Sequence, residues 1–305
     1  MIVDVHAHYY PQRYLERIGR QELPPSSSAP LGDQDVDERL QLLDRVGIDI
    51  QVLSVSQAQP YLETPGDAAQ AAVLANDLFL ALADERPDRF RVFAALPLPH
   101  VDEALAEIER VRDAEKLSGF TIGCSVGNVQ LDDPLLDPVY RRLEELGAVV
   151  FLHPVGQETT GWLSGRNLAW MVGATFEDTV AALRLVLAGV PTRFPHIRFV
   201  VPHLGGTLPF LLDRVSRKRE GALDVVAGLR SMYYDTVSGS VAALRCACSE
   251  LGDERLVLGT DYPYCDEEQL EHHVAYLEKA GLDDRTLEQI RTGTATGLLG
   301  LDGDG

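Results

Sequence analysis

Short apolar segments alternate with longer amphipathic segments along the whole chain. The apolar segments are rich in Val, Ile, Leu and Phe and lack a regular alternation with polar residues, which is typical of strands covered on both faces. We therefore predict strands at residues 2–5, 48–55, 90–96, 120–126, 149–153, 197–203, 232–237 and 256–261. Helical periodicity predicts helices at residues 37–46, 67–84, 101–115, 135–145, 176–187, 208–216, 240–250 and 267–279.

Repeated strand–helix units of this kind, in a chain of 305 residues, predict an α/β fold in which the strands close into a (β/α)₈ TIM barrel. No linker, repeat or low-complexity segment divides the chain, so we predict a single domain over residues 1–305. The irregular part is a loop insertion after the first strand, at residues 9–37, which is rich in Pro and Ser. A long loop after a barrel strand is a candidate cover for an active site.

Residues of metal-binding type gather at the carboxyl ends of four predicted strands, which is the end where such barrels carry their reactive groups. His6 and His8 lie two apart and therefore project from the same side of the first strand. His153, His203 and Asp261 end three later strands. Each has a structural alternative, as a capping, turn or hydrogen-bonded core residue. Their common position at one rim favours a functional site.

Imidazoles combined with a carboxylate are typical ligands of Zn²⁺, with Mn²⁺ and Fe²⁺ as alternatives. We predict that His6, His8, His153 and Asp261 hold one ion. The predicted fourth strand has no lysine that would bridge a second ion, so we expect a mononuclear site. His203 is then free to act as the acid or base on a metal-bound water, whose pKa a metal lowers toward about 7. We count His203 and Asp261 as the catalytic residues.

The net charge of −20, from 47 acidic and 27 basic residues, argues against nucleic acid or an anionic membrane as a partner. No stretch approaches the roughly 18 to 20 apolar residues of a membrane span. Polar residues stand at the N-terminus where a signal peptide needs an apolar region, so we expect a cytoplasmic protein. An anionic substrate would need a locally positive pocket.

The motifs resemble those of a known family. His-Ala-His at residues 6–8, Pro-His-Leu-Gly-Gly around His203 and Gly-Thr-Asp-Tyr-Pro around Asp261 resemble the amidohydrolase superfamily. Within it they resemble the branch of the 2-amino-3-carboxymuconate-6-semialdehyde, γ-resorcylate and 5-carboxyvanillate decarboxylases. The resemblance runs from residue 6 to about residue 301. It implies one Zn²⁺ on the predicted ligands, His203 as the acid/base residue, no organic cofactor and a homodimer.

The resemblance also implies substrate-binding residues. Arg39 falls where the aminocarboxymuconate enzymes carry an arginine for the substrate carboxylate, although a solvated helix charge is the alternative. Trp170 and Tyr264 fall at aromatic pocket positions, with barrel packing as the alternative. A second arginine, lent by the partner subunit in those enzymes, falls on an alanine here, and Arg217 and Arg219 are near enough to replace it.

We therefore expect a metal-dependent, non-oxidative decarboxylase, a carbon–carbon lyase, that acts on a small unsaturated or aromatic carboxylic acid. The alternative is a hydrolase of a lactone, ester or amide, or a hydratase, that uses the same site. Several cations around the open metal position would favour the decarboxylase, and a neutral pocket would favour the hydrolase. A third class, a barrel that keeps its metal for stability, would have no open metal position.

Overall fold

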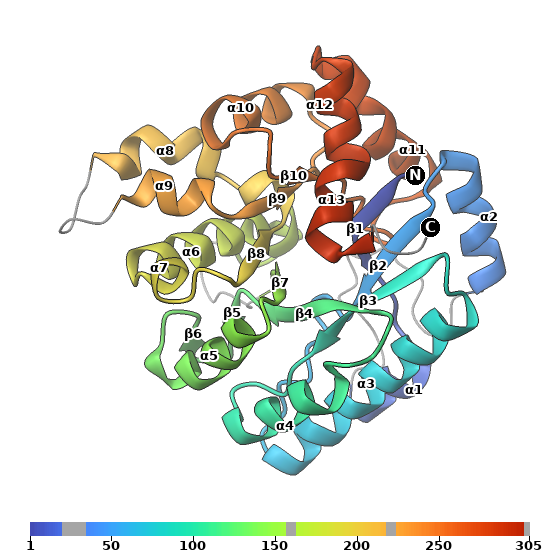
Figure 1. The fold of residues 1–305 in the computed structure, drawn as a ribbon, viewed down its shortest axis with the longest axis vertical. Coiled ribbons are helices and arrows are strands. Elements are labelled where there is room, and N and C mark those ends of the chain that lie inside the picture. The colour runs from blue at the N-terminus through green and yellow to red at the C-terminus, as the bar shows by residue number, and fades with distance from the viewer. Residues whose placement is uncertain (20–34, 157–162, 218–223, 302–305) are drawn as a thin grey trace.

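Parallel strands form a barrel at the centre of the computed structural model, which describes residues 1–19, 35–156, 163–217 and 224–301 (Figure 1). The sheet has eight strands that pair in chain order: β1 (Val3–His8), β2 (Ile50–Ser54), β3 (Phe90–Ala95), β4 (Leu117–Gly123), β7 (Val149–His153), β8 (Arg198–Val201), β9 (Tyr233–Asp235) and β10 (Leu256–Val257). The segment after β10 returns to β1, where Val5 N donates to Leu258 O at 2.9 Å. The barrel is thus nearly closed, and the predicted (β/α)₈ fold is confirmed.

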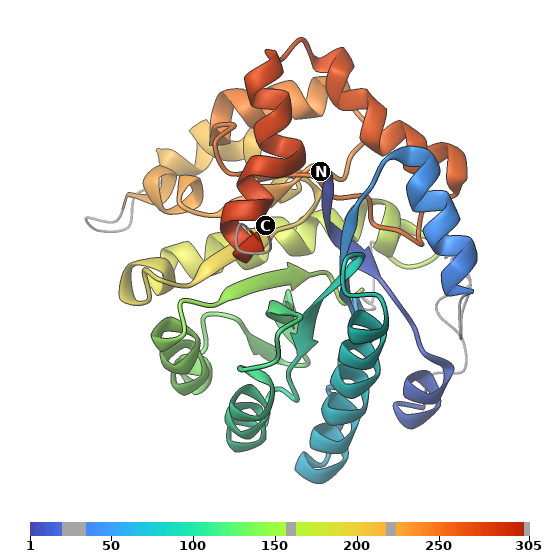
Figure 2. The ribbon, with the colours of Figure 1, turned by 45° about the vertical axis from the view of Figure 1, so that its right-hand side comes forward.

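Helices cover the outside of this barrel (Figures 1 and 2). They are α1 (Gln12–Arg17), α2 (Val36–Val46), α3 (Pro65–Glu85), α4 (Val101–Val111), α5 (Asp137–Glu145), α6 (Ala174–Leu187), α7 (Val190–Arg193), α8 (Leu208–Ser216), α9 (Val225–Arg230), α10 (Val241–Leu251), α11 (Glu267–Ala275), α12 (Asp284–Glu288) and α13 (Thr294–Leu299). The sequence pattern had not indicated α7, α9, α12 and α13. In both views α13 lies beside β1, and its Ala295 and Leu298 are buried with Val3 and Val5 in the barrel core. This helix therefore helps to close the amino end of the barrel.

Two predicted strands end earlier than expected, at the places where they carry candidate catalytic residues. β8 stops at Val201 and β10 at Val257, although we predicted strand to residues 203 and 261. His203 and Asp261 have φ angles of 55° and 62°, in the left-handed region that interrupts a strand. The backbone bends at both residues, and this bend directs their side chains onto the rim.

The predicted fourth strand also differs. β4 begins earlier than residue 120 and ends at Gly123, and Val126 instead belongs to a hairpin of β5 (Ser125–Val126) and β6 (Val129–Gln130). Of the loop insertion after β1, the structure describes α1 and the residues next to it, whereas residues 20–34 lie outside the described part. Among the described residues, no helix combines the length and the apolar character that crossing a bilayer requires.

Candidate active site

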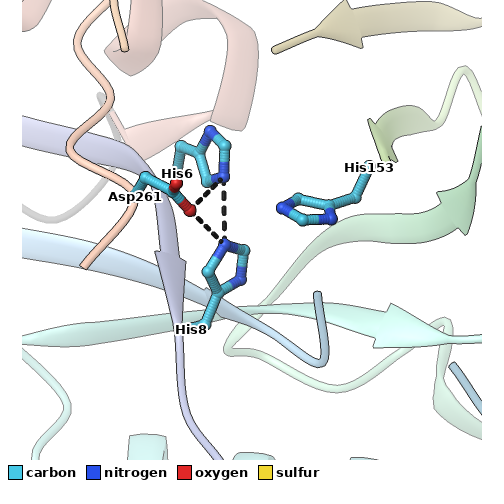
Figure 3. A group of neighbouring side chains, drawn as sticks. All are labelled: His6, His8, His153 and Asp261. Carbon is cyan, nitrogen blue, oxygen red and sulfur yellow. Dashed lines mark hydrogen bonds and ion pairs between the residues drawn. The ribbon is translucent and has the colours of Figure 1, made fainter. Parts of the chain in front are cut away.

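The four predicted metal ligands meet at the carboxyl end of the barrel. His6 and His8 come from β1, His153 from the end of β7, and Asp261 from the segment after β10, and the nitrogen and oxygen atoms that they offer all lie within 4.8 Å of one another (Figure 3). Asp261 Oδ1 lies 3.1 Å from His6 Nε2 and 3.0 Å from His8 Nε2. His6, His8 and His153 are at most 3% exposed. The sequence therefore identified a cluster that the fold does bring together.

Hydrogen bonds at the far side of each imidazole determine which nitrogen faces the cluster. His6 Nδ1 lies 2.6 Å from Asp235 Oδ2, and His8 Nδ1 lies 2.8 Å from Ser54 Oγ. His153 Nδ1 lies 2.7 Å from the carbonyl oxygen of Pro154. The Asp235 carboxylate and the Pro154 carbonyl only accept, so Nδ1 of His6 and of His153 holds a proton and leaves the lone pair of Nε2 free. The Ser54 hydroxyl can accept from His8 Nδ1 with the same result. Three such nitrogens and one carboxylate oxygen fit a divalent metal ion.

The charges of the cluster are consistent with this fit. Burial lowers the pKa of His8 to about 4, so this ring is neutral and able to bind a cation at pH 7. Burial alone would also lower the pKa of His6, but the carboxylates of Asp235 and Asp261 raise it to about 9. A bound cation would replace that extra proton. Burial opposes the charge of Asp261 as well. The surrounding imidazoles, of which His6 has the largest effect, nevertheless hold the pKa of Asp261 well below its usual value.

His203 lies beside the ligand cluster and does not belong to it. It opens a short 3₁₀ turn (His203–Gly205), and its backbone N–H donates to Asp235 Oδ1 at 2.8 Å. Its Nδ1 lies 2.8 Å from Asp178 Oδ2, and its Nε2 lies 3.8 Å from Asp261 Oδ2. The ring thus has one nitrogen tied to the protein and the other directed toward the cluster, as a proton-transfer residue requires.

A cavity of about 420 Å³ opens over these residues. Its described lining consists of Gln57, His153, Pro154, Asn167, Trp170, Met171, Ala174, His203, Asp261, Tyr264 and Gln269. The two predicted aromatic residues, Trp170 and Tyr264, both line it. Trp170 belongs to a π-helical turn (Ala169–Gly173) that leads into α6, and the Tyr264 hydroxyl accepts from Gln57 Nε2 at 2.9 Å. The described lining contains no arginine or lysine.

Arg39, the predicted substrate-binding arginine, does not line this cavity. It faces the barrel from α2 and is 2% exposed. Its Nε donates to Gln51 Oε1 at 2.9 Å and its Nη1 to the carbonyl oxygen of His8 at 2.8 Å, while its guanidinium lies 4.8 Å from the ring centre of Tyr262. The alternative of a solvated helix charge is wrong because of this burial. The contacts place Arg39 behind the backbone of the ligand strand.

Of the two arginines considered as replacements for a partner-supplied residue, the structure describes Arg217, which does not belong to the described cavity lining. Arg217 is exposed and pairs with Asp213 of its own helix at 2.8 Å. Arg219 lies outside the described residues.

The sequence analysis missed two buried carboxylates beside the candidate site. Asp178 in α6 and Asp235 at the end of β9 are both 0% exposed, and they contact His203 and His6. Asp235 is the single acidic residue of the predicted strand 232–237, which was an available signal because an unpartnered carboxylate is costly to bury. Asp178 carried no such signal, because Glu177 precedes it in the predicted helix. The pocket amides Gln57, Asn167 and Gln269 carried no comparable signal.

Comparisons with known proteins agree with this architecture. A family model described as amidohydrolase matches residues 3–301. The 2-amino-3-carboxymuconate-6-semialdehyde decarboxylase of Dictyostelium discoideum is 30% identical over 278 residues, which cover 88% of this chain and 77% of that protein. The γ-resorcylate decarboxylase of Rhodococcus jostii is 30% identical over 295 residues, covering 87% of this chain and 88% of the relative.

A solved structure shares the fold. It is a dihydroxybenzoic acid decarboxylase from a Polaromonas species with bound manganese and the inhibitor 2-nitroresorcinol. It superposes with a TM-score of 0.84 at 22% identity and covers 99% of this chain and 97% of its own.

Proposed function

This chain belongs to the amidohydrolase family, and we propose that within the family it is a metal-dependent, non-oxidative decarboxylase of a small, flat carboxylic acid with an unsaturated or aromatic skeleton. The observation that carries the proposal is the convergence of three imidazole nitrogens and the Asp261 carboxylate beside an independent, hydrogen-bonded His203. The curated relatives support the decarboxylase class, because the two described above, each 30% identical, are named as decarboxylases.

We propose His6, His8, His153 and Asp261 as the holders of the metal. The donor set suits Zn²⁺, and Mn²⁺ is the ion in the Polaromonas structure. When bound, the cation would supply Lewis acidity toward the substrate carboxylate and a neighbouring oxygen.

The cavity walls suit a flat substrate with neutral polar substituents. Trp170 offers an aromatic face on which a planar acid can stack. On the polar side, Gln57 is 2% exposed, and its Oε1 has no hydrogen-bond partner among the described residues. A hydroxyl group of the substrate is a suitable donor for this oxygen, because a buried acceptor without a partner is costly. The amides of Asn167 and Gln269 extend the polar side.

His203 would carry out the proton transfer. Its Nε2 donates a proton to the ring or alkene carbon that bears the carboxylate, and a new C–H bond forms. The electron pair of the C–COO⁻ bond then returns to the unsaturated system as CO₂ leaves. His203 regains its proton from solvent, so no organic cofactor or redox partner is needed.

The lack of arginine and lysine in the described lining supports a second candidate. Because no arginine or lysine belongs to the described lining, the cavity also suits an uncharged lactone, ester or amide, or an unsaturated acid undergoing hydration. The same ligands and His203 would serve a hydrolase or hydratase. For the decarboxylase, this lack of arginine and lysine implies that a bound metal and a protonated His203 would be the cations facing the substrate carboxylate.

Metal analysis followed by a CO₂-release screen separates the two. The screen uses the metal-loaded protein with hydroxybenzoate-type and carboxymuconate-type acids, and a parallel panel of lactones and esters. One metal per chain together with CO₂ from an acid supports the decarboxylase. One metal with product only from the lactone or ester panel supports the hydrolase. Protein that binds no metal overturns both.

We also propose a homodimer. Phe210 of α8 and Met171 beside the cavity are 85% and 68% exposed, which is unusual for large apolar side chains. Light scattering of the purified protein tests this, and a monomeric mass at micromolar concentration would contradict it.

A further inference from the structure

A carboxylate is buried on the far side of His203 from the cluster. Asp178 lies in the second turn of α6 and is 0% exposed. Its Oδ2 accepts from His203 Nδ1 at 2.8 Å, and its Oδ1 accepts from Cys124 Sγ at 3.4 Å. A thiol is a weak donor, so it compensates little of the cost of burying a carboxylate. The contact with His203 is therefore the principal compensation for this cost.

The backbone of His203 is already held in place. Its N–H donates to Asp235 Oδ1, and its φ of 55° lies in a region that non-glycine residues seldom adopt. The ring keeps rotational freedom about its own side-chain bonds, and it can carry its proton on either nitrogen. The bond to Asp178 removes both freedoms, because Nδ1 must hold a proton and must face α6. Nε2 is then left facing Asp261 and the cavity.

We propose that Asp178 is a positioning residue for the proton transfer assigned to His203, an inference that rests on the proposed function. It does not touch the substrate. It selects the orientation and the tautomer in which Nε2 exchanges the proton with the substrate carbon. The competing explanation is purely structural, with Asp178 serving only to pack α6 against the barrel and to pair with Cys124.

Two substitutions separate these explanations. Asp178→Leu is similar in size but lacks an acceptor. Asp178→Asn keeps an oxygen that can accept from Nδ1. We expect Asp178→Leu to lower kcat by about 100-fold, the low end of what general acid–base catalysis contributes, with KM changed less than about threefold. Asp178→Asn should recover most of the lost rate. Metal content should stay at the wild-type value in both variants. Asp178→Leu should lose some thermal stability because His203 Nδ1 loses its acceptor, and Asp178→Asn should lose less.

A spectroscopic readout tests the inference without any substrate. In the zinc-loaded protein, proton–nitrogen NMR should show a downfield, slowly exchanging Nδ1 proton, assigned by its loss in His203→Gln. This signal should disappear in Asp178→Leu and persist in Asp178→Asn. Cys124→Ser is the matched control, since it keeps a donor to Asp178 and leaves His203 untouched; it should keep both the signal and the rate.

Failure of this inference is distinct from failure of the proposed function. Wild-type protein that releases no CO₂ would overturn the decarboxylase, while the NMR comparison would still decide the role of Asp178. The inference is overturned if Asp178→Leu keeps the Nδ1 signal, keeps wild-type kcat, or loses metal in parallel with activity.

Discussion

Asp235 presents the sharpest test of how the metal ligands are oriented. Its Oδ1 accepts two backbone N–H groups, from His203 at 2.8 Å and from Val237 at 3.0 Å, while its Oδ2 contacts His6 Nδ1 at 2.6 Å. In Asp235→Asn the backbone N–H groups of His203 and Val237 will still need an acceptor and will bond to the amide oxygen. The amide nitrogen must therefore face His6. An amide nitrogen only donates, and His6 would then accept at Nδ1 and carry its proton on Nε2, the nitrogen intended for the metal.

The magnitude follows from the hydrogen bond that is lost. To bind metal in Asp235→Asn, His6 must move its proton back to Nδ1. The Nδ1–H group then faces the N–H group of the introduced amide, and the charge-assisted hydrogen bond to the carboxylate is lost, which costs about 1.5–3 kcal/mol. Since about 1.4 kcal/mol corresponds to tenfold in affinity, metal binding should weaken by about 10- to 150-fold. This range overlaps the roughly 10- to 100-fold effect of residues that orient metal ligands elsewhere.

Competition with a chromophoric chelator measures this affinity for Zn²⁺ and for Mn²⁺. Ser54→Ala is the matched control, because it removes the uncharged partner of His8 Nδ1 and should weaken binding by less than Asp235→Asn does. Urea unfolding of the metal-free proteins shows whether the fold is intact. Wild-type affinity in Asp235→Asn would refute the tautomer argument. An affinity loss matched by an equal loss of unfolding free energy would instead indicate a damaged fold.

Three further substitutions test the remaining assignments. His203→Ala should abolish CO₂ release while one metal per chain stays bound in elemental analysis, and surviving turnover would remove its acid/base role. Arg39→Met should lower the free energy of urea unfolding by about 2–4 kcal/mol, because two buried acceptors lose their donor; a raised KM with unchanged stability would instead assign Arg39 to the substrate. Trp170→Ala should raise KM by about tenfold, from about 1.4 kcal/mol of lost stacking, with little change in kcat, and an unchanged KM would place the substrate away from the indole.

The alternation of apolar and amphipathic segments was sufficient to predict the barrel, because strand and helix periods are local properties of the chain. The same locality explains why the clustering of the proposed metal ligands could be predicted. The two-residue period of β1 places His6 and His8 on one side, and the parallel order of the strands brings His153 and Asp261 to the same rim. The strand ends were predicted less well, since the left-handed bends at His203 and Asp261 have no hydrophobic pattern.

Contacts between distant segments required the tertiary structure. Asp235 is separated from His6 by 229 residues and Asp178 from His203 by 25, and neither pairing has a periodic signature. The burial of Arg39 likewise could not be predicted from the sequence. An arginine near the start of an amphipathic helix is ordinarily solvated, and only the packing of α2 against the barrel buries it beside Gln51 and His8. Sequence periodicity determines which face of an element is buried, whereas the partner that a buried polar group meets depends on how separate elements pack together.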